Sequence, residues 1–294
     1  DLLKRHHRHL ADLSASFQPH ALFPPVGNDE PLVRSYLLHF FVEATSTRSF
    51  ERTVRDSYLK ELFAETKIVN GIGDPDDWSA MISPARFQTL KDRVDLDFSF
   101  TNQEYFDGGA DVSLDIHVKN VDTLIVKVYE LNAQNYYRQE LQQVSTGIKL
   151  DGLVANVERT VKYEDAPLRH EERHFDFPEL NRPGVFVVDF IGNGKSSRTL
   201  VRKGKLDFLV QTTTAGHRFT VLGEQKQPVE DASLWISGTL YEAGEDGTIV
   251  VPFSTSPGMV PFVVTDGSST TLHRFQHEAE QYQMTAGIYV DREA

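Results

Sequence analysis

The first hundred residues carry apolar side chains at helical spacing. Over residues 31–41 they recur every three or four positions, which predicts an amphipathic helix with a proline in its first turn. The same spacing after Ser49 predicts a second helix that ends at Gly71, and the Ser-Pro pair at 83–84 predicts the start of a third, short helix. We expect these stripes to pack on one another or on the next domain, with partner helices as the alternative. The first stripe consists of Leu32, Val33, Tyr36, Leu37, Phe40 and Phe41.

At Val94 the period changes to two, the spacing of a half-buried strand. A run of alternating apolar residues is followed by a turn near Asn120 and by a second run, and similar segments continue between Gly, Asn and Pro turns. The apolar positions of these two runs are Val112, Leu114, Ile116 and Val118, then Leu124, Val126 and Val128. Since no helix alternates with these strands, a parallel-sheet cofactor fold is disfavoured. The pattern predicts a mainly β chain, with tandem antiparallel β-sandwiches preceded by an α-helical segment.

We divide the chain into a helical N-terminal segment over residues 1–93, a β-sandwich over 94–205 and a second β-sandwich over 206–294. Residues 1–28, rich in proline, are expected to have little regular structure. In the second sandwich, strand alternation predicts two inward rows, with Trp235 on the opposite face. The rows are Ala232, Leu234 and Ile236, and Ile249, Val251 and Phe253.

Composition and charge exclude several classes of function and partner for this chain. The 294 residues are 39% apolar and 25% charged, with a net charge of −13, which disfavours nucleic acid and anionic membranes as partners. No apolar run is long enough to cross a membrane. The chain has no cysteine, so disulfides, cysteine metal sites and thiol nucleophiles are excluded. Its start lacks a signal-peptide pattern, so we expect it to be a fragment of a longer precursor, with the basic cluster at 6–9 as a solvated terminus.

One stretch raises the question of an enzyme. His170, Glu171 and His174 match the H-E-x-x-H pattern of zinc peptidases, which needs a helix so that both histidines reach one metal. Pro167 and Pro178 leave little room for a helix, and the alternation at 174–177 is that of a strand, with its phenylalanines on one face. On a strand the two histidines lie about 13 Å apart. We therefore expect no shared metal.

Other motifs give no chemistry either. The segment 191–197, IGNGKSS, lacks the spacing of a phosphate-binding loop and predicts a hairpin turn. His273 and His277 have the spacing of a helical metal pair, but no further ligand converges on them, and no G-x-S-x-G elbow surrounds any serine. We predict that the chain is not an enzyme and that it has no catalytic, cofactor-binding or metal-binding residues.

A family resemblance rests on several segments together. "LIVKVYELNAQNYYR", "DGLVANVERTVKY", "HFDFPEL", "GVFVVDFIGNGKSSRTLVRKGKL", "AGHRFTVL" and "GEDGTIVVPFSTSPG" resemble the N-terminal macroglobulin-like domains of large bacterial-type alpha-macroglobulins. The resemblance covers about residues 94–294 and implies macroglobulin-like or immunoglobulin-like sandwiches. The thioester motif of that family, C-G-E-Q, is absent here, because Leu222 in LGEQ occupies the cysteine position.

This resemblance implies a non-catalytic scaffold or interaction fragment that contributes to protease trapping or inhibition, in an extracytoplasmic location. The expected partners are proteins, among them proteases, or other domains of the same chain. A carbohydrate- or protein-binding adhesin module is the alternative, with Trp235, Tyr136 and Tyr137 as an exposed aromatic platform. A zinc hydrolase that uses the HEERH stretch is the third candidate.

Overall fold

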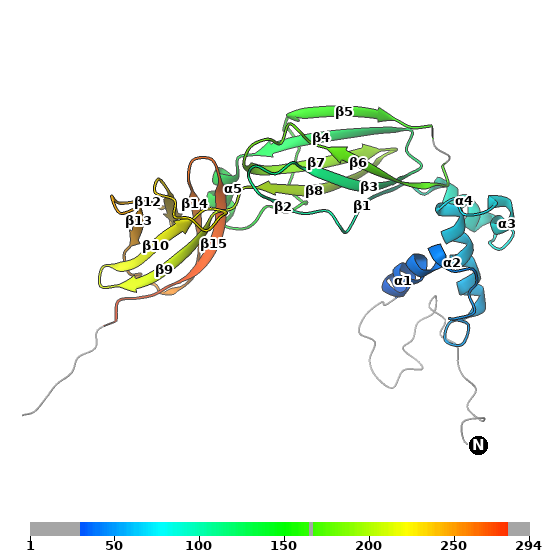
Figure 1. The fold of residues 1–294 in the computed structure, drawn as a ribbon, viewed down its shortest axis with the longest axis horizontal. Helices are drawn as coiled ribbons and strands as arrows, with labels where there is room; N and C mark the ends of the chain where they lie inside the picture. Colours follow the sequence, from blue (N-terminus) through cyan, green and yellow to red (C-terminus); the bar gives the residue numbers. More distant parts are fainter. Residues whose placement is uncertain (1–29, 165–166, 282–294) are drawn as a thin grey trace, which may run out of the picture.

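The helices and sheets follow one another along an elongated molecule (Figure 1). The computed structural model describes residues 30–164 and 167–281. A helical segment lies at one end, a first β-sandwich lies in the middle and a second, smaller one lies at the other end. The fold class is therefore mostly β with several antiparallel sheets and an N-terminal helical segment, as the sequence predicts. The predicted lead-in over 1–28 and the basic cluster at 6–9 lie outside the described residues.

Side-chain caps explain where two of the four N-terminal helices begin. Asp74 accepts a hydrogen bond from the backbone of Asp76, and Ser83 accepts one from Arg86, and each cap is followed by a proline in the first turn. The cap at Ser83 was predicted, whereas the short helix after Asp74 was missed. The helices are α1 (Glu30–Glu43), α2 (Asp56–Val69), α3 (Pro75–Ser79) and α4 (Pro84–Asp92).

The second helix starts later than predicted. Turns occupy the residues after Ser49, with the Phe50 amide bonded to the Thr47 carbonyl at 3.0 Å, and α2 begins only at Asp56. The hydroxyl of Thr47 also donates to Glu51 at 2.8 Å. Short polar side chains in this region compete with the helical backbone for hydrogen bonds, which favours turns. The predicted end of this helix, at Gly71, lies two residues beyond the observed end at Val69, and Gly71 takes a positive φ there.

The first sandwich consists of two sheets whose inner faces share one hydrophobic core. One sheet has the order β1-β3-β6 and the other β2-β8-β7-β4-β5, and all pairings are antiparallel except the short one between β2 and β8. The predicted alternation is confirmed, since the inward residues of β3 and β4 are buried. The strands are β1 (Asp95–Phe98), β2 (Tyr105–Phe106), β3 (Ser113–Lys119), β4 (Thr123–Leu131), β5 (Val157–Lys162), β6 (His170–Asp176), β7 (Gly184–Gly192) and β8 (Lys195–Lys203).

The second sandwich pairs a sheet of order β13-β10-β9 with one of order β12-β11-β14-β15. Five of the six predicted inward residues are buried in its core, but Phe253 is not among them. The strand ends at Val251, so Phe253 lies beyond it, half-buried beside the ring of His217. The strands are β9 (Asp207–Thr213), β10 (Gly216–Leu222), β11 (Ser233–Ile236), β12 (Thr239–Glu242), β13 (Thr248–Val251), β14 (Gly258–Thr265) and β15 (Thr270–His277).

The two sandwiches contact each other through a separate apolar cluster. Helix α5 (Ala133–Glu140), which the two-residue strand period does not predict, packs against β14 and β15 of the second sandwich. Tyr137 of this helix is buried in the cluster together with Val263 and Leu272. Glu224 adds a polar link, because it accepts hydrogen bonds from the amides of Gly108 at 2.8 Å and Lys205 at 3.2 Å. These contacts hold the second sandwich against the first.

Candidate functional site

A cleft separates the helical segment from the outer face of the β1-β3-β6 sheet. It has a volume of about 580 Å³, and residues of α1, α2, β1, β3 and β6 line it. The outer face of this sheet is polar because strand alternation sends Leu96, Ile116 and Phe175 into the core and their neighbours outward. Charged and imidazole groups therefore face the helices across the cleft.

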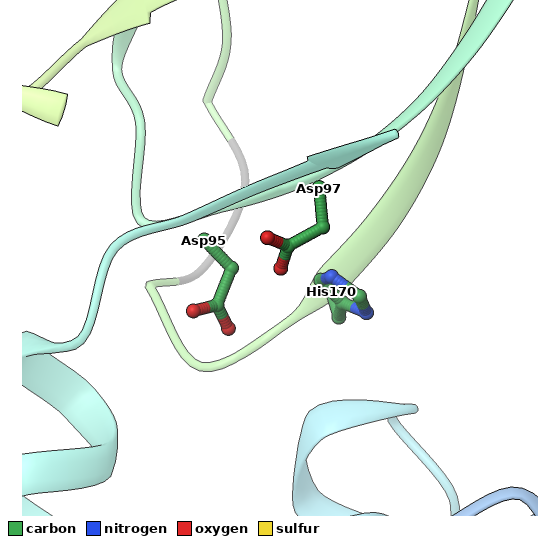
Figure 2. Close-up of side chains that lie close together, drawn as sticks. All are labelled: Asp95, Asp97 and His170. Atoms are coloured by element: carbon green, nitrogen blue, oxygen red, sulfur yellow. The ribbon is translucent and has the colours of Figure 1, made fainter. Parts of the chain in front are cut away.

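Three of these outward groups come together in Figure 2. Asp95 and Asp97 lie two residues apart on β1, so their side chains leave the strand on the same side, and His170 lies beside them at the start of β6. One ligand atom from each residue lies within 4.8 Å of the others. Both bonds from Arg93 to Asp95, of 3.0 and 2.9 Å, end on Oδ2. The Oδ1 atom of Asp95 takes no part in that ion pair.

The imidazole of His170 has a restricted environment. Its Nε2 atom is buried and has no hydrogen-bond partner among the described residues. The ring stacks on that of His117, with centroids 4.9 Å apart and planes 29° apart. Burial lowers the pKa of His170, and the neighbouring His117 lowers it further, outweighing the nearby carboxylates. The ring is therefore neutral at neutral pH.

Lys119 connects the sheet to the end of α4. Its side chain is buried, and its ammonium donates to the carbonyls of Leu90 at 2.5 Å and Arg93 at 2.7 Å. A cation at this position satisfies carbonyls that a helix leaves unbonded and complements the negative end of the helix dipole. Burial lowers the pKa of Lys119 to about 8. The contact fixes α4 against the first sandwich.

A buried carboxylate organises the helices on the other side of the cleft. Glu65 on α2 is ion-paired with Arg34 of α1, with Arg86 of α4 at 3.4 Å, and with Arg93 at 2.8 Å. Burial acts to raise the pKa of Glu65, but the hydrogen bonds and charges of Arg34 and Arg93 outweigh it, so the pKa is lowered. Since Arg93 also bonds Asp95, the network joins three helices to β1.

The H-E-x-x-H stretch lies on β6, as its alternation predicts. His170 and His174 therefore belong to different clusters. The Nδ1 atom of His174 lies 2.6 Å from Asp115 and its Nε2 atom lies 3.2 Å from Asp176, an arrangement that raises the pKa of this exposed histidine, chiefly through the bond to Asp115. Glu171 points to the other side of the strand. The structure does not assemble the peptidase constellation from these residues.

Part of the predicted apolar stripe on α1 is uncovered by the described residues. Leu37 and Phe41 pack on α2, but Leu32, Tyr36 and Phe40 are 59%, 59% and 52% exposed. These three residues are spaced by four, so they form one row on the outer face of the helix. The expectation that the stripe packs within the protein is therefore correct for one half of it only.

The predicted aromatic platform is wrong. Tyr137 is buried, and Tyr136 and Trp235 are half-buried in the apolar cluster between the two sandwiches. The guanidinium of Arg138 lies over the ring of Trp235 at 5.9 Å from its centroid. The aromatic residues face the neighbouring domain because α5, which the sequence pattern did not reveal, carries two of them there. They are therefore interdomain packing residues.

The remaining motifs have structural roles. Asn193 and Gly194 take positive φ in the predicted hairpin between β7 and β8. His273 and His277 lie on a strand, and each has a ring nitrogen beside a backbone carbonyl, at 2.7 and 2.8 Å. Glu224 of the LGEQ segment is the interdomain acceptor described above. Within the described residues, no helix is long and apolar enough to cross a membrane.

Comparisons with known proteins match two parts of the chain to domain models that come from the same protein. Residues 1–94 match the model of the actin-binding protein F N-terminal domain, and residues 124–204 match that of the AbpF first immunoglobulin-like domain. A curated relative, actin-binding protein F of Dictyostelium discoideum, is 38% identical over 272 residues, which is 90% of this chain. This chain is similar to actin-binding protein F. It spans 12% of the length of that relative.

The similarity to actin-binding protein F corrects several expectations. The resemblance to alpha-macroglobulins is wrong, and the protease-trapping function, the protease-inhibitor role and the extracytoplasmic location that it implied are wrong with it. The adhesin alternative is closer, because the matched domain is immunoglobulin-like. The expectation that the chain is not an enzyme is confirmed, since the matches describe a non-enzymatic family. The expected class of partner, protein, agrees with the name of the relative, whereas proteases have no support.

Solved structures add only a general likeness. A crystal structure of alpha-2-macroglobulin from Escherichia coli is 11% identical, with a TM-score of 0.41 over 62% of this chain and 64% of that one. A chimeric titin Z1Z2 tandem is 13% identical, with a TM-score of 0.32 over 64% of this chain and all of that one.

The cluster of Asp95, Asp97 and His170 was missed from the sequence. The paired aspartates at alternate positions of a strand start were a visible signal, but His170 is distant from them along the chain. Only the order of the sheet brings the two segments to the same face.

Proposed function

We propose that this chain contributes to an actin-binding protein and that its helical segment carries a contact for actin. The proposal is supported by the similarity to actin-binding protein F together with one observation, the exposed apolar row of Leu32, Tyr36 and Phe40 on α1. The row lies in the part of the chain that matches the N-terminal domain model. A cytoplasmic, cytoskeleton-associated location belongs to the same proposal.

The α1 row has the character of a protein-binding surface. Single exposed apolar side chains are common on proteins, but three at one helical spacing form a continuous patch. Tyr36 lies in the middle of the row, between Leu32 and Phe40. Tyrosine is among the residues that most often dominate protein interfaces, because it buries a large area at little cost in conformational entropy. We therefore assign the centre of the contact to Tyr36.

Basic residues adjoin one end of the row. Phe40 stacks on Phe50 with ring centroids 6.3 Å apart, which places the end of the row beside the α1–α2 connection. Arg48 and Arg52 are exposed in that connection. Residues 44–55 contain Arg48, Arg52 and Arg55 against one acidic residue, Glu51, and this local positive charge suits a partner surface that is locally acidic. Specific protein interfaces commonly have an apolar centre and a polar or charged rim, and this surface has the same composition.

The two sandwiches serve as a spacer in this proposal. They extend away from the helical segment in Figure 1, and the apolar cluster around Tyr137 and the bonds to Glu224 hold them together. Such an arm separates the helical segment from the far end of the second sandwich. This role needs no catalytic group.

Co-sedimentation of the full chain with actin filaments tests the proposal. We expect the chain to pellet with filaments with a Kd in the micromolar range. Replacing Tyr36 by alanine is expected to cost about 2 kcal/mol of binding, the size of an interface hot spot, or roughly thirtyfold in Kd. Changing Leu32 and Phe40 to serine should reduce binding further.

The control alters apolar residues of matched exposure elsewhere. Leu209 and Met259 of the second sandwich are 59% and 60% exposed, and their change to serine should leave pelleting unchanged. Circular dichroism confirms that each variant remains folded. The proposal fails if the chain does not pellet at about 10 µM actin, or if Tyr36→Ala binds as well as the control variant.

A further inference from the structure

The outer face of the first sandwich carries a group of side chains that lie apart from the proposed actin contact on α1. Asp95, Asp97 and His170 lie at the joint between α4 and the sheet, on the wall of the cleft. One ligand atom from each lies within 4.8 Å of the others, so an ion between them reaches all three after small movements of the side chains. The aspartates belong to β1 and the histidine to β6, and β3 lies between these strands, with Lys119 paired to Asp95 on one side and to His170 on the other. The cluster therefore depends on the tertiary fold.

The donor atoms suit a divalent transition metal. Zn²⁺ binds imidazole nitrogen and carboxylate oxygen with bonds of about 2.0 to 2.2 Å. Mg²⁺ and Ca²⁺ prefer oxygen ligands alone, so a histidine in the set disfavours them. The side chains here offer one imidazole and two carboxylates. His117, stacked on His170, supports the orientation of the ring.

The local bonding leaves this set of side chains available to an ion. The ion pair from Arg93 uses only Oδ2 of Asp95, and the ammonium of Lys119 points to the α4 carbonyls. Among the described residues, the cation paired with Asp97 is Lys195, whose Nζ atom lies 3.8 Å from Oδ1. The buried Nε2 atom of His170 has no bond from the described residues. Two adjacent carboxylates repel each other, and a bound cation relieves that repulsion.

We propose that Asp95, Asp97 and His170 bind one divalent transition-metal ion, Zn²⁺ fitting best, and that this ion stabilises the joint between the helical segment and the first sandwich. The site differs from the peptidase pattern in the sequence, because His170 is paired with aspartates of β1 and not with His174. The sequence predicted no metal because neither of its spaced histidine pairs forms a site: His170 and His174 lie on a strand, and no further ligand converges on His273 and His277. In this site the metal has a structural role.

The test uses the full chain in which His6, His7 and His9 are replaced by alanine, since these histidines would bind Zn²⁺ by themselves. After removal of metal with a chelator, isothermal titration calorimetry measures binding of Zn²⁺, Mg²⁺ and Ca²⁺. We expect one Zn²⁺ per chain with a Kd in the micromolar range or tighter, much weaker binding of the other two ions, and an increase in Tm with Zn²⁺.

Two variants and a matched control decide the result. His170→Ala should weaken Zn²⁺ binding by at least about tenfold. Asp97→Asn should weaken Zn²⁺ binding to the same extent. Because the Asp97 side chain is 61% exposed, we expect this variant to fold even if His170→Ala does not. His174→Ala, on the same strand and the same face, should bind Zn²⁺ as the parent does. The proposal is overturned if the parent binds no Zn²⁺ at about 100 µM, or if Asp97→Asn binds as tightly as His174→Ala.

Discussion

Replacing Glu65 by glutamine tests the network that holds the helical segment together. The carboxylate is only 5% exposed and is ion-paired with Arg34, Arg86 and Arg93. Removing one partner of a buried ion pair costs about 3 to 5 kcal/mol, because the charges left behind remain buried. The three guanidinium groups keep 22%, 44% and 40% exposure, so they can turn to water. We therefore expect a loss near the lower limit, about 3 kcal/mol.

The matched control is Glu61→Gln, one turn earlier on α2 and exposed. Its cost should be within about 0.5 kcal/mol. Urea unfolding of the full chain, followed by far-ultraviolet circular dichroism in the helical band, measures both variants. If Glu65→Gln costs no more than Glu61→Gln, the network does not contribute to stability as described.

The lowered pKa of Glu65 adds a dependence on pH to the same experiment. A carboxyl group with a lowered folded-state pKa stabilises the fold above its ordinary pKa of 4.5, and this contribution is lost as the pH falls through the lower, folded-state value. The difference in stability between the parent and Glu65→Gln should therefore shrink as the pH falls below about 4.5. A difference that stays constant from neutral pH to acid would contradict this assignment.

Three further outcomes are expected. Ile236→Ala should cost about 2 to 5 kcal/mol in chemical denaturation, the usual range for core cavities, and more than Trp235→Ala, which removes a half-buried ring; the reverse order would contradict the register. An NMR titration should show the pKa of His174 above its ordinary value, and Asp115→Asn should lower that pKa. The contribution of His174 to stability is then present at low pH and is lost as the pH rises through the raised pKa. Residues 94–294 should fold alone as a β protein, and substantial helix in their circular dichroism would refute that division.

The local pattern of the chain determined most of its elements. Strand alternation placed Leu114 and Ile116 in the core, and a Ser-Pro pair marked the start of α4. These features depend on side-chain periods of a few residues and on caps within one turn. The same local information identified β6 as a strand, and this excluded a peptidase site shared by His170 and His174.

Only the tertiary structure decided what the outward residues do. The sheet order β1-β3-β6 brings Asp95 and Asp97 to His170, and α5 carries Tyr137 into the interface between the sandwiches. The tertiary structure also decides which half of the α1 stripe is covered by α2. The physical reason is that a period shows which side chains share a face, but not which other element packs on that face. Strand pairing and domain packing join residues distant in sequence, and no local pattern records those pairings.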